Sequence, residues 1–256
     1  MPITSRKNEL IVKISKLKEK KHRDTTGLFL LCGKKLLSEA IASKIKIKYI
    51  FATEKNTAEA ENAAKICGAE LYFTSEDVFC KLTDEQSPDG ICAVGEIPKR
   101  NADIKDKDFV LICDGLADPG NAGAVLRSAR AFGAGAVIFS AGCADIYSQK
   151  VLRGAMGAVF AGNIITGADT KSVISELKSR GFHTYAAALH TDAVPLGTAD
   201  LSGGCAVVIG NEGHGLSDDI ISACGETLFI EMEPECESLN AAVAASVILY
   251  KRYAGV

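Results

Sequence analysis

The sequence contains little that would mark a membrane or secreted protein. Its 256 residues include no tryptophan, three methionines and six prolines, and hydrophobic residues make up 47% of the chain. No apolar run approaches the roughly 18 residues that a membrane-spanning helix needs, and the segment Met1–Lys7 lacks the apolar core of a signal peptide. We therefore expect a soluble cytoplasmic protein with no membrane partner, long enough to bury one large core or two modest ones.

Metal and disulfide chemistry is also poorly supported, although the chain has nine cysteines. None of them forms a Cys-x-x-Cys pair, and most lie in apolar or alanine- and glycine-rich stretches, where a free thiol packs as a small hydrophobic group. No cysteine has a histidine nearby in the sequence, so nothing indicates a thiol nucleophile. The pattern predicts reduced thiols and no bound metal.

Acidic and basic residues are distributed unevenly, although the net charge is only −3. Residues 1–48 contain 13 lysines and arginines against 4 acidic residues, whereas the rest of the chain contains 16 against 28. A basic region of this kind attracts phosphate backbones through the release of counterions. It is equally typical of a solvated basic helix, so charge alone leaves contact with nucleic acid open.

The first hundred residues alternate between short helices and strands. Apolar residues recur at helical spacing within residues 5–21. The polar stretch 99–107 has few apolar residues, which is typical of a linker between domains. We therefore predict an N-terminal domain over 1–98 and a second domain over 108–256. Strands are expected at 28–32, 47–52, 70–74 and 91–95, and helices at 34–42, 57–67 and 77–82.

The second domain alternates apolar strands with helices. Strands without a polar face, each followed by a helix, are typical of a mainly parallel α/β sheet covered on both sides. The helix expected at 149–160 contains Arg153-Gly154-Ala155-Met156-Gly157, whose small residues indicate close packing against another backbone. Strands are expected at 109–113, 136–140, 183–189, 205–209 and 227–232, and helices at 122–131, 149–160, 171–180, 218–224 and 239–253.

Three loops that follow strands of this sheet carry the candidate site. Ligands of open α/β sheets bind beyond the carboxyl ends of the strands, so these loops should lie together. The first, 114–123, contains Asp118-Pro119-Gly120-Asn121 and is followed by Arg127 on the next helix. The second, 210–217, contains three glycines, which let backbone amides approach a ligand closely. The third, 231–238, leads into the last helix.

These segments resemble the three motifs of a known enzyme family. Asn121-x-Gly123-x-x-x-Arg127, Gly210-Asn211-Glu212-Gly213 and Ser238-Leu239-Asn240 are similar in order and spacing to the motifs of the SpoU (TrmH-type) RNA 2′-O-ribose methyltransferases of the SPOUT superfamily. The likeness covers residues 109–253. More weakly, the segment Thr4–Asn8 and the block around Gly33-Lys34 resemble that family's accessory domain, which is similar to small ribosomal RNA-binding proteins.

The resemblance implies a fold, a reaction and partners. The second domain would be a trefoil-knot domain with a mainly parallel sheet, an exception to the usual absence of knots, and the first would be a small α/β RNA-binding domain. The protein would be a homodimer that transfers a methyl group from S-adenosylmethionine to a ribose 2′-hydroxyl of RNA, with 23S ribosomal RNA as the expected substrate. By position, the residues expected to contact the cofactor are Gly210, Ile230, Met232 and Leu239.

The residues expected to act on the substrate are Arg127, Asn121, Glu212, Ser238 and Asn240. The family assigns the arginine a role in activating the hydroxyl, but an arginine, with a pKa above about 12, is a poor base. We expect Arg127 to stabilise the developing alkoxide and to bind the adjacent phosphate. Asn121 could bind substrate or cap the following helix, and Glu212 could order its loop or pair with an arginine, including Arg127 of the partner subunit. Ser238 and Asn240 could face a ligand or serve only as N-caps.

The sequence departs from the family at two places. Where the family usually has Ile-Pro-Met and then a glycine, this chain has Ile230-Glu231-Met232-Glu233-Pro234-Glu235, and Leu31-Cys32 stands where an acidic residue often precedes Gly33. The altered cofactor loop makes a non-catalytic RNA-binding protein one alternative, and a transfer RNA substrate is another. A dinucleotide-dependent oxidoreductase is the third, which the absence of Gly-x-Gly-x-x-Gly in the first loop and of an acidic residue after 136–140 disfavours.

Overall fold

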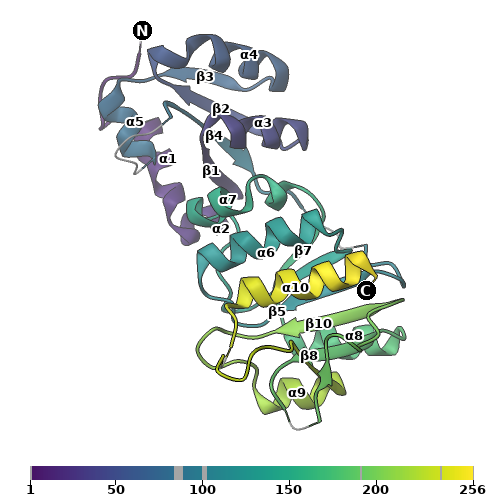
Figure 1. Cartoon of the computed structure of the whole chain (residues 1–256). Coiled ribbons are helices and arrows are strands. Elements are labelled where there is room, and N and C mark those ends of the chain that lie inside the picture. Colours follow the sequence, from purple (N-terminus) through teal and green to yellow (C-terminus); the bar gives the residue numbers. More distant parts are fainter. Residues whose placement is uncertain (1, 84–88, 100–102, 191, 237, 256) are drawn as a thin grey trace. The chain divides into compact units, whose positions relative to one another are not determined.

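The protein divides into two compact units (Figure 1). The computed structural model describes residues 2–83, 89–99, 103–190, 192–236 and 238–255. The first unit comprises Met1–Lys99 together with Asp145–Phe160, and the second comprises Arg100–Ala144 with Ala161–Val256. The chain therefore enters the first unit twice. None of the described helices is both long and apolar enough to cross a membrane.

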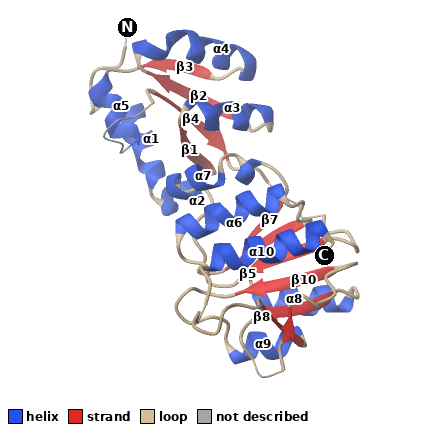
Figure 2. Cartoon of the chain, in the orientation of Figure 1, coloured by secondary structure: helices blue, strands red, loops and turns tan. Residues whose placement is uncertain are grey.

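The first unit is built on a four-stranded mixed sheet with the order β1-β4-β2-β3 (Figure 2). β4 runs antiparallel to β1 and β2, whereas β2 and β3 are parallel. The strands are β1 (Leu28–Cys32), β2 (Ile47–Ala52), β3 (Glu70–Phe73) and β4 (Ile91–Glu96). The helices are α1 (Glu9–Ser15), η1 (Lys16–Lys18), α2 (Lys20–Thr26), α3 (Lys34–Ala42), η2 (Glu54–Asn56), α4 (Thr57–Cys67) and α5 (Glu76–Thr83).

The amphipathic segment at the start of this unit forms three short helices. Asn8 caps α1, because its side chain accepts hydrogen bonds from two backbone amides of the first turn at 3.0 and 3.3 Å. The chain continues into η1 and becomes extended at Glu19 before α2 begins. Ile11, Ile14 and Leu17 are buried in the core of the unit. The predicted periodicity identifies the buried face correctly, whereas the break at Glu19 has no counterpart in it.

The second unit contains a seven-stranded sheet with the order β7-β6-β5-β10-β8-β11-β9. Each pair of neighbouring strands is parallel. β5 and β10 are neighbours and buried throughout, although many residues separate them in the chain. The predicted α/β fold class with a mainly parallel sheet is confirmed. The strands are β5 (Phe109–Cys113), β6 (Ala136–Ser140), β7 (Asn163–Ala168), β8 (His183–Ala187), β9 (Val194–Pro195), β10 (Cys205–Ile209) and β11 (Glu226–Phe229).

Helices cover both faces of this sheet, as a parallel sheet requires (Figure 2). α8 (Thr170–Ser179) and α9 (Asp218–Cys224) pack onto one face, in a core that includes Val110 of β5 and Val208 of β10. On the other face α6 (Pro119–Ala131) and α10 (Ala241–Ala254) lie side by side, with the hydroxyl oxygens of Ser128 and Ser246 2.7 Å apart.

Two strands of this sheet, β7 and β9, are missing from the sequence prediction. Both are edge strands, and β7 is partly exposed whereas β9 has only two residues, one of them Pro195. An edge strand pairs on one side only, so it needs no continuous apolar run and tolerates proline. The strand expected over 227–232 ends at Phe229, which leaves Ile230 and Met232 in the loop that follows.

The segment Asp145–Phe160 lies in the first unit, although the sequence prediction assigned it to the second domain. The single helix predicted over 149–160 is wrong. α7 (Gln149–Ala155) ends because Met156 and Gly157 adopt φ values of +47° and +80°, and a short helical turn, η3 (Ala158–Phe160), follows. A Cβ at Gly157 would lie 2.8 Å from the Cβ of Glu39, so the close approach is to a side chain of α3.

A buried ion pair holds this segment within the first unit. The side chain of Arg23 is 4% exposed, and its Nε and Nη2 lie 2.9 and 2.5 Å from Oδ2 of Asp145. Its Nη1 donates to the carbonyl oxygens of Leu17 and Lys18, each at 2.7 Å. The guanidinium therefore has partners on two sides in a site that water scarcely reaches.

We predict that Asp145→Asn destabilises the protein by about 3 kcal/mol, because it leaves the buried charge of Arg23 without its counter-ion. Glu76→Gln is the matched control, since Glu76 pairs with Lys55 at 2.5 Å but both side chains are more than half exposed. Loss of that exposed pair should change the stability far less, because water already solvates both charges. Urea unfolding followed by circular dichroism measures both, and equal losses would contradict the prediction.

Candidate functional site

The three predicted loops emerge at one edge of the seven-stranded sheet. Because the strands are parallel, the loops that follow β5, β10 and β11 all leave from the carboxyl edge. The first and second loops follow neighbouring strands. The third begins at β11, which is separated from β5 by β8 and β10, yet it ends at Asn240 beside the first loop.

The side-chain amide of Asn121 connects these loops. Its Nδ2 donates to Oε1 of Glu212 at 2.6 Å, and its Oδ1 accepts a hydrogen bond from Nδ2 of Asn240 at 3.0 Å. Glu212 and Asn240 lie 91 and 119 positions after Asn121 in the chain. One residue from each of the three motifs therefore takes part in a single hydrogen-bonded chain, which we call the Asn121 network.

Asn121 can make these bonds because another residue caps its helix. Asp118 is the N-cap of α6, where its Oδ1 accepts a hydrogen bond from the backbone amide of Asn121 at 2.8 Å. Pro119 follows at the first helical position, where its missing N–H costs nothing. The alternative in which Asn121 serves only as a cap is therefore wrong.

Asn240 both caps a helix and joins the network. Its Oδ1 accepts hydrogen bonds from the backbone amides of Ala242 and Val243 at 2.9 and 3.3 Å, which caps α10, while its Nδ2 reaches Asn121. Ser238 is exposed and, among the residues that the structure describes, takes no part in the network. The structure thus brings together Asn121, Glu212 and Asn240 but leaves Ser238 at the surface.

Asn211 shapes the second loop, and the sequence prediction did not include it among the site residues. Its Nδ2 donates to the carbonyl oxygen of Gly115 at 2.8 Å, which joins the second loop to the first. Its Oδ1 accepts from the amide of Gly213 at 2.8 Å, and its backbone pairs with Gly215 in both directions. A Cβ at Gly210 would lie 2.4 Å from the carbonyl carbon of Gly215. The sequence did offer a signal for this role of Asn211, because the side chain of an asparagine in a glycine-rich turn often forms hydrogen bonds with the backbone.

The side chains of Ser140 and Cys143 hold the backbone of the first loop in place through hydrogen bonds. Ser140 Oγ accepts the amide hydrogen of Gly115 at 2.9 Å, and Cys143 Sγ accepts that of Leu116 at 3.2 Å. The Cys143 thiol in turn donates to the carbonyl oxygen of Cys113 at 3.2 Å. Burial raises the pKa of Cys143, so the thiol keeps the proton that this bond requires. This cysteine orders the loop.

Arg127 lies on α6 outside the Asn121 network. Its side chain is exposed and forms no hydrogen bond or ion pair with any residue that the structure describes. It lies six positions after Asn121, a rotation of about 600° around the helix, so the two side chains point roughly 120° apart. The positive charge is therefore available to an incoming phosphate or to a second copy of the chain.

Two of the predicted cofactor residues, Gly210 and Ile230, directly follow β10 and β11 at their carboxyl ends. The third loop runs from Ile230 after β11 to Asn240 beside the first loop, so it crosses the ends of β8 and β10, where Gly210 lies. Ile230 and Met232 are half-buried and Leu239 is 37% exposed, which leaves apolar surface uncovered there. Apolar groups near a side-chain-free backbone fit an adenine ring, since ligand sites are mostly apolar with a few polar groups. Within the described part of the chain, no group of three or more His, Cys, Asp or Glu could hold a metal ion.

The unusual residues of the third loop form a turn at the surface. The amide of Cys236 donates to the carbonyl oxygen of Glu233 at 2.9 Å, which closes the turn around Pro234. Oε2 of Glu231 accepts a hydrogen bond from the amide of Gly197 at 3.3 Å. The glutamates of this turn are exposed, so the departure from the family pattern adds surface charge beside the loop and places no carboxylate in a buried position.

Two family models match the chain. The model of the SpoU rRNA methylase family matches residues 108–250, and the model of the MRM3-like substrate-binding domain matches residues 8–93. The first match spans more than half of the chain and contains all three loops. The second falls within the first unit.

Individual relatives agree with the family match. The chain is 33% identical to the 23S rRNA (guanosine(2553)-2′-O)-methyltransferase of Bacillus subtilis over 97% of both chains. Among solved structures, it is similar to an AdoMet-bound rRNA methyltransferase from Sinorhizobium meliloti, with a TM-score of 0.89 and 26% identity over 100% of this chain and 98% of the other. It is also similar to a structure described as an RNA 2′-O ribose methyltransferase, with a TM-score of 0.83 and 31% identity over 98% of each chain.

We predict that Gly210→Ala destabilises the protein by about 1–3 kcal/mol, because the added methyl group would overlap the backbone of the second loop. Gly213→Ala is the control, since a Cβ there would meet only Oδ1 of Asn211, at 3.4 Å. Thermal unfolding followed by circular dichroism compares the two variants. A midpoint for Gly210→Ala equal to that of Gly213→Ala would show that the loop can shift freely.

Proposed function

Because the chain belongs to the SpoU rRNA methylase family, we propose that it methylates a ribose 2′-hydroxyl of 23S ribosomal RNA at the Asn121 network. It is an RNA ribose methyltransferase that uses S-adenosylmethionine. The observation that carries the proposal is the meeting of Asn121, Glu212 and Asn240, one from each motif, at the carboxyl edge of a parallel sheet. Membership of this family rules against the alternative that the protein is a dinucleotide-dependent oxidoreductase.

S-adenosylmethionine supplies an electrophilic methyl group on a sulfonium, so the protein must mainly align that group with the ribose oxygen. We propose that Gly210, Ile230, Met232 and Leu239 hold the cofactor, with the backbone of the second and third loops providing its polar contacts. The first loop faces the substrate in this proposal, and the second and third loops hold the cofactor. The Asn121 network fixes the distance between them. A trefoil knot in this region is expected from the family.

Arg127 acts on the substrate in this proposal. It stays charged at neutral pH, so it binds the phosphate beside the target ribose and stabilises negative charge on the 2′-oxygen as the proton leaves. Its exposure and its freedom from partners among the described residues support this role. Ser238, which is exposed two residues before Asn240, is proposed to contact the substrate or the cofactor directly.

The choice of ribosomal RNA rests on the first unit and on the relatives. The matched substrate-binding domain, residues 8–93, includes most of the basic segment 1–48, and the Bacillus subtilis relative is named for 23S rRNA. Transfer RNA is the alternative substrate within the same family. All nine cysteines are unpaired, which supports work in the reducing cytoplasm.

A homodimer is supported by an exposed apolar stripe on the second unit. Leu239, Val243, Val247 and Tyr250 are 37%, 48%, 36% and 55% exposed, and their spacing places them along one side of α10 and the turn before it. Exposed apolar surface of this extent usually marks an interface. α6, which carries Arg127, lies beside α10, so a second copy docked on the stripe would come close to Arg127.

We predict that Arg127→Ala lowers methyl transfer by about 10²- to 10³-fold, the usual loss when one electrostatic contact to the transition state is removed. Binding of S-adenosylmethionine, measured by calorimetry, should be unchanged. Transfer of labelled methyl groups to 23S rRNA from cells that lack the modification gives the rate, and Arg130→Ala on the same helix is the control. Equal rates for both variants would overturn the role of Arg127. RNA binding without any transfer by the wild type would favour the non-catalytic alternative.

We predict that Val243→Asp with Val247→Asp converts a dimer into a monomer, because two charges would then have to be desolvated at the interface. Light scattering after gel filtration measures the mass. Ile66→Asp is the control, because Ile66 is 64% exposed on α4 of the first unit. A wild-type protein that is already monomeric would remove the basis for an arginine supplied by a partner subunit.

A further inference from the structure

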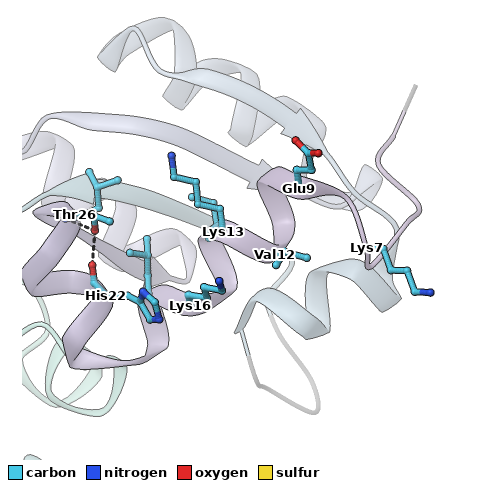
Figure 3. A pocket seen from close by; sticks show the side chains of 10 residues that line it. Lys7, Glu9, Val12, Lys13, Lys16, His22 and Thr26 are labelled. Atoms are coloured by element: carbon cyan, nitrogen blue, oxygen red, sulfur yellow. Dashed lines mark hydrogen bonds between the residues drawn. The ribbon is translucent and has the colours of Figure 1, made fainter.

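The first unit carries a groove that the proposed reaction does not use. It has a volume of about 520 Å³ and is formed by α1, η1, α2 and the start of β1 (Figure 3). Lys13 and Lys16 stand on α1 and η1, His22 on α2, and Thr26 at the end of α2. The groove lies entirely within the part of the chain where basic residues are concentrated.

The rim of this groove holds lysines that the fold does not use. Lys7, Lys13 and Lys16 are exposed, and none of their side-chain ammonium groups forms a hydrogen bond or ion pair with any residue in the described ranges. Glu9 is the only carboxylate among the lining residues. Several other basic side chains of this unit are paired within it: Arg6 with Asp77, Arg23 with Asp145, Lys34 with Glu59, Lys46 with Glu96 and Lys55 with Glu76.

The floor of the groove is apolar. Ile14 and Leu17 are 1% and 3% exposed and form the base, while Val12 and Leu28 are half-buried and leave apolar surface open to the groove. The volume falls within the range of small-ligand sites. A purely electrostatic contact with a double helix needs no such concavity, because duplex RNA is recognised by shape and by contacts to phosphates and 2′-hydroxyls.

We propose that this groove binds an unpaired nucleotide of the RNA substrate, with its base on Val12 and Leu28 and its flanking phosphates against Lys13 and Lys16. Recognition of RNA most often uses unstacked bases of loops and bulges, which present an apolar face together with charged phosphates. The groove offers the complementary pair of surfaces. The proposal rests on the proposed function, because it takes the substrate to be RNA, and it adds a second place of contact away from the reacting ribose.

The test compares two double variants of the full-length protein. Lys13→Gln with Lys16→Gln removes two charges from the rim, and Lys44→Gln with Lys65→Gln removes two exposed lysines elsewhere in the same unit. Fluorescence anisotropy with a single-stranded oligoribonucleotide of about 12 nucleotides, long enough for a typical single-strand site, gives the affinity. For the rim variant we expect roughly 10- to 30-fold weaker binding at 0.1 M salt and a salt slope smaller by about 1.4. The control should change little; equal effects would overturn the proposal.

A third variant tests the floor separately from the charge. Val12→Gln replaces an apolar side chain of the floor by a polar one without altering any charge, so it should weaken binding of the single strand while binding of the same sequence as a duplex stays unchanged. Weaker binding in the rim variant with normal binding in Val12→Gln would show that the surface attracts RNA only through charge, which would overturn the nucleotide site. Unchanged RNA binding in every variant would also overturn it and would favour an acidic protein partner.

Methyl transfer and binding of S-adenosylmethionine are measured on the same preparations. If the wild type transfers methyl groups to 23S rRNA but the groove variants bind and react normally, the groove proposal alone is wrong. If the wild type transfers nothing but the groove variants lose affinity for the oligonucleotide, the proposed function fails and the groove stands. In the expected result, the rim variant shows a raised KM for RNA with an unchanged affinity for the cofactor.

Discussion

The amide of Asn121 is the constraint on which the candidate site depends. An amide offers one donor group and one acceptor oxygen, and here the donor binds Glu212 while the acceptor binds Asn240. The two bonds hold three loops together that follow different strands. If Asn121 had to cap α6, backbone amides would engage its Oδ1 and compete with the bond from Asn240, so the presence of Asp118 at the cap is part of the same arrangement. The chemistry proposed for the site needs this registration, because methyl transfer tolerates little error in alignment.

The parallel sheet determines where these loops meet, and small residues determine how closely. β5 and β10 are neighbours, so their loops leave the sheet side by side and are joined by Asn211 and Gly115. Gly210 allows the second loop to fold back on itself within a distance that excludes any side chain. The third loop then crosses the ends of β8 and β10 to reach the first. A cofactor held between the second and third loops would lie next to the Asn121 network, which accounts for the family's use of all three motifs.

The first unit incorporates a segment from the second half of the sequence. Asp145 pairs with the buried Arg23, and the rings of Tyr147 and Phe160 lie 4.9 and 5.9 Å from the ring of Phe29. The groove of the same unit is lined by α2, the helix that supplies Arg23. The pair that fastens the inserted segment therefore also fixes one wall of the surface proposed to bind RNA. With a second recognition surface of this kind, the first unit would select the RNA while the loops of the second unit carry out the methyl transfer.

Much of the fold and of the motif set could be predicted from the sequence. The apolar strands β5, β6 and β10 and the alternation with helices are written in local patterns, because a buried parallel strand must be apolar on both faces. Asn121, Glu212, Asn240 and Arg127 were predicted from the resemblance of their segments to the family's motifs. Edge strands β7 and β9 could not be found in this way, because they are partly exposed or too short to show a pattern. What only the tertiary structure decided is which partner each polar group takes: that Asn121 binds rather than caps, that Asn211 joins two loops, that Cys143 supports one of them and that Asp145 belongs with Arg23. Local sequence carries the conformational propensity of a residue. A hydrogen bond between residues 91 or 122 positions apart depends instead on which segments the tertiary structure brings together.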